Sequence, residues 1–243
     1  DVTGVQTCAL PICLLTFVFF FVRPAFALDP SKTLSQYQLR TWTSEAGLPA
    51  NYINAIVHGR DGYLWIGTEE GLARFDGFTF TVFDRRNTPA FVDHNVQALH
   101  VDAAGTLWIG TRGAGLIAYR DGAFSTLSTK DGLPSDRILA IGSSADGTVW
   151  VGTNGGGLVR VRGTSVDALT TAAGLADNRI VSLDVDNAGA VWAGTESGAL
   201  VHVIGDRVEN IALPEMDAVV AVEAARDGSA SWEYRRSVLG RAR

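Results

Sequence analysis

Leu64-Trp65-Ile66-Gly67-Thr68 is a five-residue motif that returns three more times along the chain. The other copies occupy residues 107–111, 149–153 and 191–195, and their tryptophans follow at intervals of 43, 42 and 42 residues. Self-similarity at a fixed period of this length indicates a repeat architecture, in which each repeat packs against its neighbours. The motif therefore decides the fold class before any single residue is interpreted.

Each repeat contains four short segments of β type, of which the motif is the second. The first begins 12 residues before each tryptophan, at 53–57, 96–101, 138–141 and 180–185. The third covers 72–75, 116–119, 158–161 and 200–203, and the fourth covers 78–83, 124–127, 166–169 and 208–213. Four strands per repeat of about 42 residues predict an all-β fold, a β-propeller of four-stranded blades.

The motif residues have packing roles in such a blade. The tryptophans fill the space between neighbouring sheets, and the glycine two residues later lets the next sheet approach closely. The threonine hydrogen-bonds at the strand end, and a glycine three residues before each tryptophan allows a positive φ in the turn. The predicted blade core is Trp65, Trp108, Trp150, Trp192, Gly67, Gly110, Gly152 and Gly194.

The repeats cover residues 37–228, which give four complete blades and a partial fifth. A strand over 37–42 is expected to precede the first blade. The fifth repeat begins at 218–224 and is aligned on Trp232, but no Gly-Thr follows, so residues 229–243 are interpreted as an off-pattern tail. We expect a truncated arc with an exposed apolar face and an unpaired edge at its C-terminal end.

The N-terminal region has a different character. Residues 14–22 form an apolar run that is followed by Ala25-Phe26-Ala27, which predicts a signal peptide over 13–27 with cleavage after Ala27. Residues 1–12 contain no Met, Lys or Arg and are interpreted as non-native adapter or assembly sequence, and 28–36 as a linker.

Composition excludes several function classes. The net charge of −6 argues against nucleic acid, and the two cysteines both precede the repeats. Neither the histidines nor the acidic turns have metal-ligand spacing, so we expect turn or packing roles for them. Arg85-Arg86 is interpreted as a solvated pair. No nucleophile elbow, P-loop or zincin motif occurs, and we expect no catalytic residue, cofactor or metal.

Residues 61–77, DGYLWIGTEEGLARFDG, together with the Gly-Leu-Pro segment that begins at Gly47, resemble the two-component regulator propeller repeat. The resemblance implies an exported ligand-sensing domain of a bacterial hybrid histidine kinase or diguanylate cyclase, of which this chain is an N-terminal fragment. It also implies a periplasmic location, an inner-membrane anchor in a downstream segment and a homodimer in the full receptor.

Geometry suggests where a ligand would bind. The turn after the tryptophan strand and the loop before the next first strand should emerge at the same end of each blade, and polar residues vary there from repeat to repeat. The expected ligand is a small molecule or a saccharide. Alternatives are a propeller lyase or a protein-interaction scaffold. The candidate ligand-binding residues are Glu69, Arg112, Asn154 and Glu196.

Overall fold

The structure is a computed structural model of the 243-residue chain, and it describes residues 40–213, 218–225, 228–234 and 239–242. The chain divides into two compact units, Asp1–Thr41 and Trp42–Arg243. The predictions for 1–12, 13–27 and 28–36 lie outside the described residues. Among the residues that are described, no helix has the length and apolar character needed to cross a membrane.

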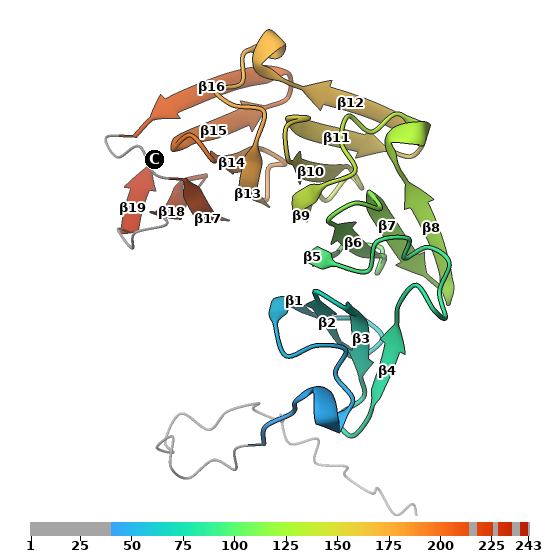
Figure 1. Ribbon diagram of the computed structural model, residues 1–243. Coiled ribbons are helices and arrows are strands. Elements are labelled where there is room, and N and C mark those ends of the chain that lie inside the picture. The colour runs from blue at the N-terminus through green and yellow to red at the C-terminus, as the bar shows by residue number, and fades with distance from the viewer. Residues whose placement is uncertain (1–39, 214–217, 226–227, 235–238, 243) are drawn as a thin grey trace, which may run out of the picture. The chain divides into compact units, whose positions relative to one another are not determined.

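Trp42–Arg243 is built from antiparallel sheets, here numbered 1 to 5 in chain order (Figure 1). Sheet 1 contains β1 (Ile53–His58), β2 (Leu64–Thr68), β3 (Gly71–Phe75) and β4 (Phe80–Phe83). Sheet 2 contains β5 (Val96–Val101), β6 (Leu107–Thr111), β7 (Leu116–Arg120) and β8 (Ala123–Leu127). Sheet 3 contains β9 (Ile138–Ser143), β10 (Val149–Thr153), β11 (Leu158–Arg162) and β12 (Ser165–Leu169).

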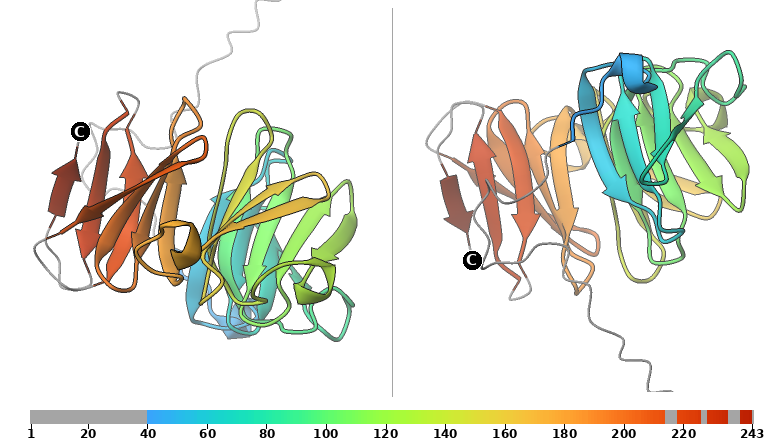
Figure 2. Two further views of the ribbon diagram at one scale, coloured as in Figure 1. Left: turned by 90° about the horizontal axis from the view of Figure 1, so that it is seen from above. Right: turned by 90° about the horizontal axis from the view of Figure 1, so that it is seen from below.

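Sheet 4 contains β13 (Ile180–Val185), β14 (Val191–Thr195), β15 (Ala199–Ile204) and β16 (Arg207–Ala212). Sheet 5 has three strands in the described part of the chain, namely β17 (Val219–Ala224), β18 (Ala230–Tyr234) and β19 (Leu239–Ala242). The prediction of a β-propeller with four complete blades and a partial fifth is therefore confirmed. The first strand of each sheet contacts the first strand of the next, and the turns gather at the two ends of the strands (Figure 2).

Sheet-to-sheet packing follows from the motif as predicted. Trp65, Trp150 and Trp192 are at most 4% exposed, and each faces the next sheet. A Cβ at Gly67 would lie 2.6 Å from Val96, and one at Gly110 would lie 2.7 Å from Ile138. Only glycine admits the following sheet at these distances, so the Trp-x-Gly spacing is a packing device.

Trp108 departs from the pattern because it is only half-buried. The residue directly opposite the tryptophan on the neighbouring strand is Arg74 in sheet 1, Arg160 in sheet 3 and His202 in sheet 4. In sheet 2 that residue is Ala118, whose methyl group covers little of the indole. The sequence motif is therefore the same in all four sheets, while the burial of its tryptophan depends on the facing strand.

The turns also match the prediction. Gly62, Gly105, Gly147 and Gly189 all have a φ of 84° or 85°, in the left-handed region that glycine tolerates. Aspartates in these turns accept backbone N–H groups; Asp102 Oδ1, for example, accepts from Ala104 and Thr106 at 2.9 Å. The motif threonines bond the carbonyl at the start of the third strand, at 2.8–3.0 Å from Thr68, Thr111, Thr153 and Thr195.

The predicted strand before the first blade is corrected for its described residues. Arg40, Thr41 and Trp42 form no strand, although residues 37–39 lie outside the described part. Trp42 instead packs edge-on against Phe75 at 5.0 Å. The Gly-Leu-Pro loop is preceded by a short 3-10 helix, and similar helices recur before sheets 3 and 4: η2 (Ser44–Ala46), η3 (Thr129–Asp131) and η4 (Thr171–Ala173).

The interpretation of residues 229–243 as an off-pattern tail is wrong for the described residues 229–234 and 239–242, because β18 and β19 pair within sheet 5. The alignment on Trp232 was the source of the error. The turn bonds from Ala225 N to Ser229 O and from Gly228 N to Ala225 O match those of the other sheets. In that register Ser231 takes the tryptophan position and Trp232 the next one, where it points back toward Trp192 of sheet 4.

The expected exposed apolar face at the C-terminal end is corrected by the same shift. Successive residues of a strand point to opposite faces. Val222, Ala230 and Trp232 therefore contact sheet 4. Glu223 and Ser231 stand opposite each other on the other face, where Glu223 is exposed. Among the described residues, the outer face of sheet 5 is thus polar at the position that tryptophan occupies elsewhere.

Candidate functional site

The end of the sheets that the sequence singled out is organised by backbone hydrogen bonds. In sheets 2, 3 and 4 the turn after the tryptophan strand is tied to the residue that precedes the first strand of the same sheet. Arg112 N donates to Asn95 O at 2.9 Å, and Glu196 N donates to Arg179 O at 3.0 Å. Asn154 N makes the same bond to Arg137 O. The turns and the loops before the first strands therefore lie at one end, as expected.

The four candidate residues occupy this end but do not converge on one cleft. The side chain of Glu196 lies 3.7 Å from Arg179 Nη1, and Glu69 is exposed beside Glu70. Each of the four lies in the turn of a different sheet, because every sheet repeats the same turn after its tryptophan strand. Their part in binding stays a prediction.

Three of the loops at this end share a structural device. A side-chain oxygen accepts the first backbone N–H of the 3-10 helix seven residues before it. The pairs are Ser44 N to Asn51 at 2.7 Å, Thr129 N to Asp136 at 2.6 Å and Thr171 N to Asn178 at 2.8 Å. These polar residues thus have a sufficient structural explanation as caps.

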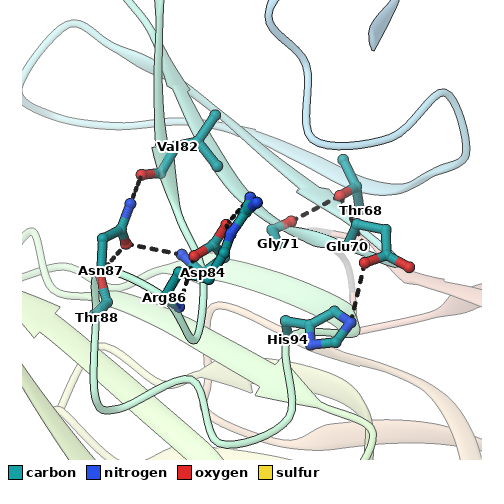
Figure 3. A network of polar contacts seen from close by, with 9 residues as sticks. All are labelled: Thr68, Glu70, Gly71, Val82, Asp84, Arg86, Asn87, Thr88 and His94. Carbon is teal, nitrogen blue, oxygen red and sulfur yellow. Dashed lines mark hydrogen bonds and ion pairs between the residues drawn. The ribbon is translucent and has the colours of Figure 1, made fainter.

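The loop between β4 and β5 departs from that device. It runs from residue 84 to 95, two residues longer than the corresponding loops 128–137 and 170–179, and it has no 3-10 helix. Figure 3 shows the network that replaces it. Asn87 Oδ1 accepts from Asp84 N at 3.0 Å, Asn87 Nδ2 donates to Val82 O at 2.8 Å, and Phe91 is fully buried below.

Asp84 is the centre of this network. It is 4% exposed, and its carboxylate accepts from the backbone N of Arg86 at 2.8 Å and from Arg86 Nε at 2.9 Å. The hydrogen bond from the Arg86 side chain is the main cause that holds the pKa of Asp84 below its ordinary value. Arg85 and Arg86 are both exposed, as expected for a solvated pair, and the guanidinium of Arg86 is in addition held on the buried carboxylate of Asp84.

His94 stands at the position that Asp136 and Asn178 occupy in the other loops. With no helix to cap, its Nε2 lies 3.1 Å from Glu70 Oε2 of the β2–β3 turn in sheet 1. Figure 3 shows the two side chains pointing toward one another. His94 was expected to have only a packing or solvent role. The contact depends on the different loop length, which motif spacing does not reveal.

A cleft of about 350 Å³, which is within the usual range for small-ligand sites, lies beside this loop. Its lining offers donors from two arginines and His94 and acceptors from two carboxylates, with no serine or cysteine nucleophile. Such a set binds polar groups of either sign, and its departure from the repeated caps marks it as the candidate site. The lining residues are Pro49, Glu70, Asp84, Arg85, Arg86 and His94.

Replacing Asp84 with asparagine is expected to lower the free energy of unfolding by roughly 1 kcal/mol near neutral pH, because charge-assisted hydrogen bonds to Arg86 are lost and solvent screens that exposed guanidinium. The folded-state pKa lies below the unfolded value of about 3.9. The contribution is therefore present above about pH 4 and is lost as the pH falls through the folded pKa. Urea unfolding of both proteins from neutral pH into the acid range measures this.

Asp121→Asn is the matched control, because its carboxylate lies 3.6 Å from Arg120 Nε but is 92% exposed. That pair should contribute little at any pH. A stability difference between wild type and Asp84→Asn that stayed constant down to about pH 2 would contradict the assignment of the Arg86 contact to the ionised carboxylate.

A family model matches three segments of the chain. The model described as two component regulator propeller matches residues 47–70, 90–113 and 132–155. These segments run from the Gly-Leu-Pro loop, or its counterpart in the second repeat, through the tryptophan strand. No curated protein matches the sequence.

Several solved structures share the fold. The extracellular domain described as that of the hybrid two component system BT3049 from B. thetaiotaomicron has a TM-score of 0.70 at 21% identity, covering 83% of this chain and 31% of that one. The extracellular domain of the one component system BT4673 from the same organism has a TM-score of 0.65 at 20% identity, covering 80% of this chain and 28% of that one. Virginiamycin B lyase from Staphylococcus aureus has a TM-score of 0.63 at 12% identity, covering 81% of this chain and 71% of that one.

These identities support the propeller fold alone, and the chain spans less than a third of the length of the two extracellular domains. The segments matched by the family model hold the motifs of residues 64–68, 107–111 and 149–153, whose structural roles are described above. The chain carries two component regulator propeller repeats.

Proposed function

We propose that the chain is the extracytoplasmic ligand-sensing part of a bacterial two-component or cyclic-di-GMP signalling receptor, and that it has no catalytic activity of its own. The repeats of the two component regulator propeller family support this, as do the extracellular domains among the structures of similar fold. In this proposal the apolar segment 14–22 directs export, and the receptor is anchored in the inner membrane downstream and acts as a homodimer.

The β4–β5 loop carries the proposal at the level of residues. The β8–β9 and β12–β13 loops, and the segment before β1, use a 3-10 helix and one capping side chain. The β4–β5 loop instead fixes Arg86 on buried Asp84 and brings His94 to Glu70 of sheet 1. Polar groups held in place on a rigid scaffold are typical of binding sites. The ligand is a small polar molecule or a saccharide that uses these groups.

The test is a signalling assay in the complete receptor. The coding sequence downstream of the repeats is first read to its stop codon, and a membrane helix followed by an output domain is expected. Arg85→Gln and Glu70→Gln should then reduce the response to the cognate ligand, whereas Asp206→Asn, in a turn at the opposite end of sheet 4, should not. A reading frame without a membrane helix and output domain would contradict the proposal.

A propeller lyase is the second candidate, and one contact favours it. His94 Nε2 and Glu70 Oε2 are 3.1 Å apart at one end of the sheets, which suits a general base and the group that orients it. Virginiamycin B lyase has the same fold over 81% of this chain. Loss of a type B streptogramin on incubation with the protein, abolished by His94→Ala, would favour the enzyme over the sensor.

A further inference from the structure

Two arginines occupy the same place in two sheets. Arg74 stands directly opposite Trp65, and Arg160 stands directly opposite Trp150. Their guanidinium carbons lie 5.8 Å and 5.9 Å from the centres of these indole rings. The pair therefore allows one position of the repeat to be compared in two electrostatic settings.

Arg160 is neutralised within the protein. Its neighbour across β11 and β12 is Asp167, whose Oδ2 lies 3.7 Å from Arg160 Nη2. Asp206, from the β15–β16 turn of the following sheet, accepts from Arg160 Nη1 at 3.0 Å. Both carboxylates lie within ion-pair distance of the guanidinium, so this arginine has a structural role.

Arg74 lacks both partners. Its neighbour across β3 and β4 is Thr81 instead of an aspartate, and in the described part of the chain no carboxylate lies within 4.0 Å of its guanidinium. Aromatic rings hold it instead, with its Cζ 4.4 Å from the centre of Tyr63 and 6.0 Å from that of Phe83. Cation–π contacts fix the position of a guanidinium but leave its N–H fork available to an anion.

The unpaired guanidinium lines a cleft of about 450 Å³ between sheets 1 and 2. The cleft lies among the β1–β2, β5–β6 and β7–β8 turns, at the opposite end of the strands from the Glu70–His94 contact. Arg60 and Arg120 add positive charge, and Tyr63 and Tyr119 add aromatic surface.

Two aspartates also line the cleft, and both are engaged elsewhere. Asp61 accepts the Tyr63 backbone N–H at 3.1 Å, and Asp121 lies 3.6 Å from Arg120 Nε. With three arginines and two aspartates, the lining carries a net charge of about +1. That balance suits a monoanion better than a dianion, and the planar guanidinium fork matches a planar carboxylate.

We propose that this cleft binds a small organic carboxylate, which pairs with Arg74 in the role that Asp167 and Asp206 fill for Arg160. The aromatic lining favours a ligand with a flat apolar body. The site is independent of the proposed sensing cleft, because the two share no residue and lie at opposite ends of the strands.

The test uses calorimetric titration of the full chain with sodium benzoate, and with benzamide as a neutral ligand of nearly the same shape. Benzoate should bind at least about tenfold more tightly than benzamide, because only the carboxylate accepts charge-assisted hydrogen bonds. Arg74→Gln should remove that preference, whereas Arg160→Gln should retain it. Inorganic phosphate should bind more weakly than benzoate.

A second variant keeps Arg74 and supplies the carboxylate partner that Arg160 has and Arg74 lacks. Thr81 is exposed, so Thr81→Asp should fold normally and place a carboxylate where Asp167 stands in sheet 3. It should weaken benzoate binding about as much as Arg74→Gln does, without lowering the melting temperature. Equal binding of benzoate and benzamide, or unchanged benzoate affinity in a folded Thr81→Asp protein, would overturn the proposal.

Discussion

Gly110→Val is expected to lower the free energy of unfolding by about 3 kcal/mol or more, because it forces a branched side chain between two packed sheets. A Cβ at Gly110 would already lie 2.7 Å from Ile138 Cγ2 and 3.2 Å from Ile141 Cδ1. Both isoleucines belong to the buried core between sheets 2 and 3, so neither can move without opening a cavity elsewhere. Chemical denaturation followed by tryptophan fluorescence measures the loss.

Gly113→Val is the matched control for that substitution. It lies three residues further along the chain in an exposed turn, where a Cβ would meet the end of the flexible Asp93 side chain, with Oδ2 at 2.6 Å. Moving the end of that flexible side chain costs at most its hydrogen bond from Asn95 N, so the loss should be smaller than at Gly110. Similar losses for the two variants would contradict the claim that the motif glycine acts through sheet-to-sheet distance.

Trp150→Ala is the second large effect, with an expected loss of about 3–5 kcal/mol. Its side chain is 4% exposed, lies in the core between sheets 3 and 4, and donates from Nε1 to Ser144 Oγ at 3.2 Å. Truncation would leave a large cavity beneath Val191 and Val203, which the rigid sheets cannot fill. Urea denaturation is the measurement.

Trp108→Ala provides the comparison, since it removes the same residue from the same motif position. Trp108 is half-buried because Ala118 faces it. The loss should be roughly half that of Trp150→Ala, in proportion to the apolar area returned to water. If both tryptophans gave equal losses, burial by the facing strand would not control the contribution of this motif.

The repeat fold was predictable because its signal is redundant. Four copies of one motif fix the strand spacing, and the steric need for glycine at 67, 110, 152 and 194 is visible in each copy. The fifth repeat had no such support. There the most conspicuous residue, Trp232, misled the alignment by one position, and only the turn hydrogen bonds of Ala225 and Gly228 establish the register.

The candidate cleft was only partly predictable. The end of the sheets follows from strand alternation, and the β4–β5 loop is one of the loops before a first strand that the sequence places in the expected recognition surface. The β4–β5 loop is two residues longer than its counterparts and folds over Phe91. The contact of Arg86 with buried Asp84, and that of His94 with Glu70, both depend on this fold. Nothing in the repeat pattern describes an element that occurs once.

The displaced tryptophan of sheet 5 has a consequence for solubility. Arrays of stacked repeats need end units with a polar outer side, since an apolar one would recruit further copies of the chain. Sheet 5 turns its indole toward sheet 4 and leaves Ser231 and Glu223 on its other side. At this position its outer side therefore attracts a further copy of the chain less strongly than a sheet with an outward tryptophan would.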